Sequence, residues 1–192
     1  MRVIGGRWRG RRLETAAGEV RPTADRVREA LFSMLAAEIP DQHVADLCCG
    51  SGALGIEALS RGAAEVDFVD LAPTSLAATR ANLERCGAPP GSWRLHRADA
   101  VRWLGRRWTA PDPPRVILAD PPYGGAAAAA LVDLLRAGPP PGILVVVLEH
   151  PARETPLAAA PPGWTLDTRR HGGTALSVLR PATPDEAEAR HG

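Results

Sequence analysis

The chain has 192 residues, of which 45% are hydrophobic and 4% aromatic, and its formal net charge is +1. This length favours one domain, which leaves room for a small appendage, and its aliphatic core needs no disulfide or metal. The three cysteines, Cys48, Cys49 and Cys86, form no C-x-x-C pair, and the histidines lack ligand spacing. A disulfide framework, a zinc site or any other metal site is therefore not expected. Without a signal core or a membrane-length apolar stretch, we expect a soluble cytoplasmic protein.

Positive charge gathers at the beginning of the chain. All 23 basic residues are arginines, and residues 1–12 hold five of them and no acid: Arg2, Arg7, Arg9, Arg11 and Arg12. Such a basic segment on a nearly neutral protein suggests an anionic partner, such as a phosphate backbone. Taken alone, the run is more typical of a solvated basic arm.

The first 40 residues predict a small extension. Residues 2–6 and 11–14 flank the basic stretch 7–10, which indicates a short hairpin or strand pair with a basic tip. Trp8 could stack on a base or merely cover the hairpin, and the second role is the commoner. Thr23 can cap a helix that ends at Pro40. Its apolar face recurs at helical spacing: Val27, Ala30, Leu31, Met34 and Leu35.

From residue 41 onward, apolar runs alternate with helical stretches. The expected strands are 44–49, 66–69, 93–96, 116–119 and 143–148, and the expected helices are 53–60, 73–85, 98–107 and 126–136. This alternation predicts an α/β fold with a buried parallel sheet and helices on both faces. Residues 164–170 and 175–179 indicate a terminal hairpin. We therefore expect an extension (1–40), a main domain (41–180) and a disordered tail (181–192).

A glycine loop follows the first of these strands. Residues 50–55 read G-x-G-x-x-G, so Gly50 and Gly52 can adopt positive φ beside a ligand, and Gly55 permits close helix–strand contact. Asp70 ends the next strand, where a carboxylate can accept hydrogen bonds from ribose hydroxyls. The loop alone suits a dinucleotide dehydrogenase equally well.

Two further acids favour S-adenosylmethionine as the ligand. Asp46 lies inside the first strand, where it could bind the amino group of a cofactor and brace the loop. Asp99 follows the third strand, within reach of an adenine amine. Each has a purely structural alternative, because Asp46 could anchor the loop and Asp99 could cap the following helix.

The tetrapeptide Asp120-Pro-Pro-Tyr123 follows the fourth strand. An aryl amine is a poor nucleophile, so a site must orient its nitrogen towards the methyl donor. Asp120 can accept one N–H and the Pro121 carbonyl another, while Pro122 stiffens the turn and Tyr123 can stack on the base. In isolation the motif could equally be a rigid turn. Together with the glycine loop, it predicts methyl transfer to the exocyclic amine of a base.

These strings resemble the bacterial RsmD family of 16S ribosomal RNA guanine-N2 methyltransferases. The matching segments are Arg2–Gly10, Arg21–Phe32, Gly50–Gly62 and Asp120–Tyr123. The resemblance implies a class I (Rossmann-like) methyltransferase fold with a seven-stranded, mostly parallel sheet and an N-terminal hairpin and helix. It also implies S-adenosylmethionine as the donor, and as the acceptor a guanine of 16S rRNA in the small ribosomal subunit or its assembly intermediate.

The resemblance assigns roles to named residues. For the cofactor we expect Asp46, Gly50, Ser51, Gly52, Asp70, Leu71, Asp99 and Ala100. For the target amine we expect Asp120, Pro121, Pro122 and Tyr123, and for RNA Arg7, Arg9, Arg11, Arg12, Arg21, Thr23 and Arg26. The chain departs from the family at Cys48-Cys49, where an aromatic and a small residue are expected.

Other functions remain open at this level. An adenine-N6 or cytosine-N4 methyltransferase could use the same tetrapeptide, although the short chain leaves little room for a DNA-recognition domain. A dinucleotide-dependent oxidoreductase would leave residues 120–123 without a role. A non-catalytic RNA-binding factor of ribosome assembly would need no cofactor. We expect a monomer.

Overall fold

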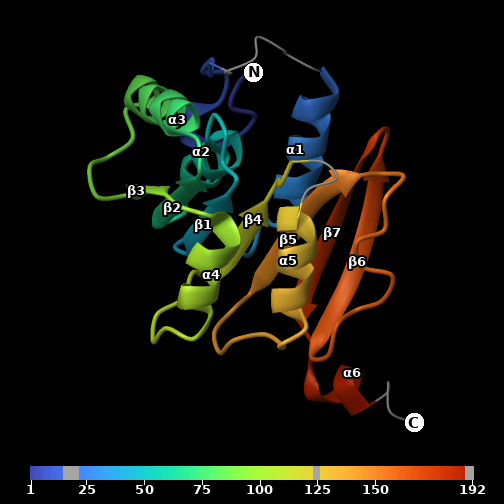
Figure 1. The fold of residues 1–192 in the computed structure, drawn as a ribbon. Helices are drawn as coiled ribbons and strands as arrows, with labels where there is room; N and C mark the ends of the chain where they lie inside the picture. Colours follow the sequence, from blue (N-terminus) through green and yellow to red (C-terminus); the bar gives the residue numbers. More distant parts are fainter. Residues whose placement is uncertain (15–21, 123–125, 189–192) are drawn as a thin grey trace.

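The computed structural model describes residues 1–14, 22–122 and 126–188, which include a seven-stranded sheet (Figure 1). Its strand order is β3-β2-β1-β4-β5-β7-β6, and β7 runs opposite to the other six strands, so that it pairs antiparallel with β5 and β6. The predicted mostly parallel sheet is therefore confirmed. The strands are β1 (His43–Leu47), β2 (Glu65–Asp70), β3 (Trp93–Arg97), β4 (Val116–Ala119), β5 (Val145–Pro151), β6 (Trp164–His171) and β7 (Thr174–Pro181).

Helices cover both faces of this sheet (Figure 1). One face packs against α1 (Pro22–Met34), α2 (Ala53–Ser60) and α3 (Pro73–Cys86), and the other against α4 (Ala100–Trp108) and α5 (Ala126–Leu135). Successive strand residues point to opposite faces. In β4, Val116 and Leu118 join the α1 side, while Ile117 and Ala119 join the α4 side. The central strands are therefore apolar throughout.

The strand order reverses between β1 and β4. From β1 the chain moves outward to β2 and β3, and it then returns to place β4 on the other side of β1. The loops that leave β1 and β4 therefore diverge, and a crevice opens between them at the carboxyl ends of the strands. Ligands of open α/β sheets bind at this point.

The N-terminal segment matches the predicted hairpin only in part, because residues 1–3 and 11–13 run antiparallel and exchange backbone hydrogen bonds but form no extended ladder. A single antiparallel bridge joins Arg2 to Arg12, and the segment between them contains a 3-10 helix, η1 (Gly6–Trp8). Gly6 and Gly10 have φ values of 73° and 85°, so the chain curls instead of continuing a ladder. Trp8 is buried, which confirms its expected covering role.

Buried polar contacts fasten this segment to α2. The Glu57 carboxylate, which is fully buried, accepts the N–H groups of Ile4 at 2.7 Å and Gly5 at 2.8 Å, and it also accepts Arg61 Nε at 2.7 Å. The Ser60 hydroxyl accepts the Trp8 N–H and donates to the Gly5 carbonyl. The basic segment is therefore held in a fixed position against α2.

Two boundaries also differ from the predictions. Helix α1 begins at Pro22, whose fixed φ suits the first helical position, so Thr23 lies inside the first turn and is not the cap. The same helix ends at Met34, before the turns that lead to Pro40.

In the tail expected to be disordered, Pro184–Glu188 forms the short helix α6. None of the described helices is long and apolar enough to cross a bilayer.

Replacing Glu57 should loosen the N-terminal segment. Glu57→Ala leaves two partly buried backbone N–H groups and Arg61 without their acceptor, so we expect the free energy of unfolding to fall by about 3 kcal/mol. Urea denaturation measures this loss, and trypsin should cleave after the arginines of residues 2–12 faster than in the native chain. Glu84→Ala, at an exposed position of α3, is the control. Equal stability and equal cleavage in both variants would contradict this role of Glu57.

Candidate active site

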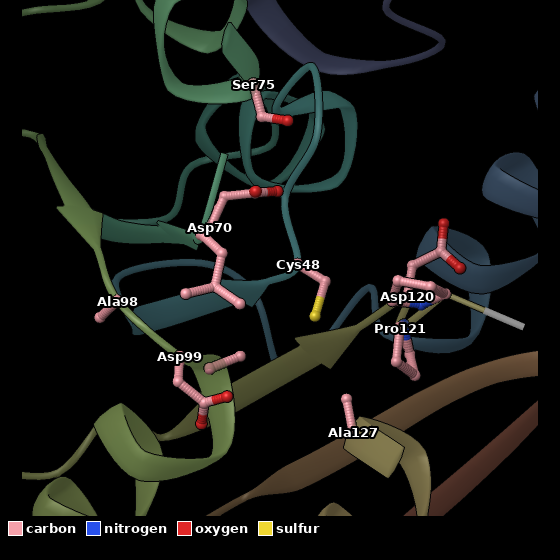
Figure 2. A pocket seen from close by; sticks show the side chains of 11 residues that line it. Cys48, Asp70, Ser75, Ala98, Asp99, Asp120, Pro121 and Ala127 are labelled. Carbon is pink, nitrogen blue, oxygen red and sulfur yellow. The ribbon is translucent and has the colours of Figure 1, made fainter. Parts of the chain in front are cut away.

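A cavity of about 580 Å³ opens where the first four strands end (Figure 2). Each of these strands contributes at its carboxyl end, as the reversed strand order requires. The lining residues are Cys48, Asp70, Leu71, Ser75, Ala98, Asp99, Ala100, Asp120, Pro121, Pro122 and Ala127. The structure thus brings the ends of β2 and β3 together with the Asp120 turn in one cavity.

Asp70 links the cavity to the glycine loop. Its Oδ2 atom accepts the Gly50 N–H at 2.9 Å, and its Oδ1 atom accepts the Ala72 N–H at 2.8 Å. These bonds fix the carboxylate at the end of β2. Because each carboxylate oxygen has a second lone pair, Asp70 can still accept hydrogen bonds from a ligand.

Asp99 caps the helix that follows it, which is the structural role considered from the sequence, and it also lines the cavity. Its Oδ1 atom accepts the Arg102 N–H at 2.8 Å, which caps α4. Its neighbours Ala98 and Ala100 line the same wall. A capping carboxylate is held rigidly, so this acid can also present an acceptor to a ligand in the cavity.

The glycine loop has the backbone expected from its sequence. Gly50 and Gly52 have φ values of 54° and 77°. At Gly55 a Cβ atom would stand 2.3 Å from the Phe68 ring, which confirms the predicted close packing of α2 on β2. Gly50, Ser51, Gly52 and Asp46 do not belong to the lining of the cavity, although the space beside Gly50 is open.

Asp46 is a buried acid with a free acceptor atom. Its Oδ2 atom accepts the Gly55 N–H at 2.8 Å, whereas Oδ1 has no partner among the described residues. Burial raises the pKa of Asp46 well above its usual value, the Gly55 bond opposes this shift, and the charges of Asp120 and Asp70 add to it. A ligand that brings a positive charge or a hydrogen-bond donor would lower the free-energy cost of burying this acid.

The Asp120 turn forms the opposite wall (Figure 2). Figure 2 shows Asp120 and Pro121 across the cavity from Asp70 and Asp99, with the Cys48 sulfur between the two groups. The Asp120 side chain is exposed to solvent, and partial desolvation by the surrounding protein raises its pKa to about 6. Tyr123, the expected stacking residue, lies outside the described residues.

Cys48 is placed for packing rather than for nucleophilic chemistry. Burial, followed by the negative charges of Asp70 and Asp46, raises the pKa of its thiol to about 11. Its φ of 57° turns the chain from β1 into the glycine loop. Ser75 and Ala127 line the cavity without having been predicted. Both lie in the first turns of helices, where side-chain type alone gives no signal.

The described arginines expected to bind RNA are all exposed: Arg7, Arg9, Arg11, Arg12 and Arg26. Arg9 and Arg26 line a second groove of about 610 Å³ between the N-terminal segment and α1. Arg7 stands over the Trp8 ring at 4.4 Å, and Arg11 donates to the Arg85 carbonyl at 2.7 Å. Arg21 and the Thr23 side chain lie outside the described residues.

The family model described as "Conserved hypothetical protein 95" matches residues 1–180. The chain belongs to this family. The match extends over the N-terminal segment, the sheet and the cavity. It agrees with the RsmD resemblance of the sequence, because proteins named ribosomal RNA small subunit methyltransferase D are among the chain's relatives.

Two relatives illustrate this similarity. Ribosomal RNA small subunit methyltransferase D of Escherichia coli is 40% identical over 124 residues, which are 64% of this chain. The chain spans 60% of the length of that relative. The putative rRNA methyltransferase YlbH of Bacillus subtilis is 39% identical over 64% of this chain and 67% of its own length.

A solved structure extends the likeness to nearly the whole fold. The putative methyltransferase yhhF from Escherichia coli superposes with a TM-score of 0.78 at 32% identity, covering 94% of this chain and 97% of its own. The seven-stranded sheet with its single antiparallel strand is thus the class I methyltransferase fold that the sequence predicts.

Asp46→Asn should stabilise the protein when no ligand is bound. Because the pKa of Asp46 is raised in the folded protein, folding favours the protonated acid. The stability that protonated Asp46 contributes is therefore present at low pH, and it is lost as the pH rises through the folded-state pKa. An asparagine keeps an acceptor for the Gly55 N–H and carries no charge. Urea denaturation should show a more stable variant at pH 8 and a smaller difference at pH 4. A variant less stable than the native protein at pH 8 would contradict this account.

Proposed function

We propose that this protein transfers a methyl group from S-adenosylmethionine to the exocyclic N2 amine of a guanine in 16S rRNA of the small ribosomal subunit. The observation that carries the proposal is the shared cavity, in which the Asp120 turn faces the acids at the ends of β2 and β3. One wall suits a nucleoside-containing donor. The other suits a planar amine.

The donor wall fits the parts of S-adenosylmethionine. Asp70 would accept the ribose hydroxyls and Asp99 the adenine amine, with Ala100 beside the ring. Leu71, whose side chain is 64% exposed beside the cavity, would cover the adenine. The free Oδ1 atom of Asp46 and the open side of Gly50 would receive the methionine end, with Ser51 and Gly52 completing the loop.

The Asp120 turn would orient the acceptor. When bound, S-adenosylmethionine supplies a methyl carbon on a positively charged sulfur. The Asp120 carboxylate would accept one N–H of the amine and the Pro121 carbonyl the other, so that the nitrogen lone pair points at this carbon. Pro122 would keep the turn rigid, and Tyr123 would stack on the base. As the N–C bond forms, the C–S bond breaks, and the surplus proton of the nitrogen leaves through Asp120 or solvent.

Exposed arginines would supply affinity for the RNA backbone. The groove lined by Arg9 and Arg26 lies between the N-terminal segment and α1. Phosphate contacts of this kind position a nucleic acid without reading its sequence. Arg7, Arg11, Arg12, Arg21 and Thr23 would extend this surface. The small-subunit substrate is inferred from the relatives' names and from the RsmD resemblance.

Asp120→Ala should abolish methylation and keep cofactor binding. Loss of the amine acceptor is expected to lower kcat/KM by about 100- to 1000-fold, while calorimetry with S-adenosylhomocysteine should give a nearly unchanged Kd. In the native enzyme kcat/KM should rise as the pH passes about 6, because the ionised carboxylate is the better acceptor. Asp112→Ala, at an exposed position, is the control. Normal methylation by Asp120→Ala would refute the assignment.

Nucleoside analysis tests the identity of the acceptor. Small subunits from a strain that lacks the gene, incubated with the protein and methyl-labelled S-adenosylmethionine, should yield labelled N2-methylguanosine at one nucleotide. Labelled N6-methyladenosine or N4-methylcytidine would favour the alternative methyltransferases. No transfer, combined with thermal stabilisation by NAD instead of S-adenosylhomocysteine, would favour an oxidoreductase.

A further inference from the structure

Glu149 lies beside Asp120 at the carboxyl edge of the sheet. Strands β4 and β5 are parallel, and their last paired residues are Ala119 and Leu148. The next residues along the two strands are Asp120 and Glu149. Because neighbouring strands lie about 4.8 Å apart, this register places two acidic residues side by side. They are 29 positions apart in the sequence, so only the fold brings them together.

Both carboxylates belong on the α1 side of the sheet. Val145 and Val147 pack on that side, so the alternation along β5 directs Glu149 the same way. Leu176 of β7, which pairs with Glu149, lies in the same core cluster as Val145 and Val147. The buried Arg28 of α1 interacts electrostatically with Glu149. Glu149 therefore stands between the Asp120 turn and α1, the helix that borders the arginine groove.

Apart from its electrostatic interactions, the Glu149 carboxylate has no bonded partner in the part of the chain that the structure describes. Its half-buried side chain forms no hydrogen bond or ion pair with the described residues. Arg28 donates instead to Asp25 at 2.9 Å and to the Arg2 carbonyl at 2.6 Å. Burial, and secondly the charge of Asp120, raises the pKa of Glu149 to about 8, and Arg28 opposes this only in part. A second acid at this position lowers the stability of the fold and makes no compensating hydrogen bond with the described residues, which is typical of a functional position.

We propose that Glu149 is a specificity residue that accepts the N1–H of the target guanine while Asp120 accepts an N–H of its N2 amine. This inference rests on the proposed function. Guanine presents N1–H and N2–H groups next to each other, and two neighbouring carboxyl groups match these adjacent donors. A purine with an unprotonated N1 places a lone pair against the Glu149 oxygen and is disfavoured.

A purine analogue tests this inference. Small subunits are reconstituted with guanine or 2-aminopurine at the methylated nucleotide, since 2-aminopurine keeps the N2 amine but has no N1–H. At pH 8.5, above the Glu149 pKa of about 8 and below that of the guanine N1–H, the native enzyme should prefer guanine by about 10- to 100-fold in kcat/KM. Glu149→Gln, whose amide can donate to an unprotonated N1, should reduce this preference at least about tenfold. Glu84→Gln is the control.

The outcomes separate this inference from the proposed function. If native enzyme methylates guanine but Glu149→Gln keeps the native preference, or loses both activities in proportion, Glu149 does not read N1 and the inference fails. If native enzyme methylates no guanine, the proposed function fails first. If Glu149→Gln loses affinity for S-adenosylhomocysteine, the test is repeated with Glu149→Asp. A guanine preference that Glu149→Asp retains supports the inference. An equal loss of kcat/KM on guanine and on 2-aminopurine overturns it.

Discussion

The reversal of strand order between β1 and β4 is the constraint on which the site depends. Because both strands are buried and parallel, their carboxyl ends meet at one edge of the sheet, and the chain leaves them in opposite directions. The opening between them becomes the cavity. Asp70 and Asp99 reach it from one side and Asp120 from the other, although these residues are far apart in the sequence.

The charge around this cavity indicates the kind of ligand that it can hold. Asp46, Asp70, Asp99 and Asp120 gather near it, and among the described residues that line it there is no arginine, lysine or histidine. Crowded carboxylates in a partly desolvated site repel one another and lower the stability of the empty protein. A cationic ligand offsets this cost. S-adenosylmethionine carries a positive sulfur and an ammonium group, whereas a dinucleotide brings two phosphates into the same acidic surroundings.

Local patterns predicted much of the fold, and tertiary contacts decided the rest. The buried strands and Gly55 follow directly from sequence, because an apolar run and a glycine that must admit the Phe68 ring are local requirements. The N-terminal segment does not, because its curl depends on Glu57 of α2, a partner more than 50 residues away. The proximity of Glu149 to Asp120 also could not be predicted from the sequence, since it depends on the register of β4 and β5. Asp99 shows that a structural role and a ligand-facing position can coexist in one residue.

A crystal structure with bound S-adenosylhomocysteine is the decisive measurement, because it locates the sulfur that would carry the methyl group in the proposed reaction. We expect the nucleoside between the ends of β2 and β3, with the sulfur facing the turn at Asp120 and Pro121 across the cavity. A ligand bound elsewhere, or one whose sulfur points away from that turn, would contradict it.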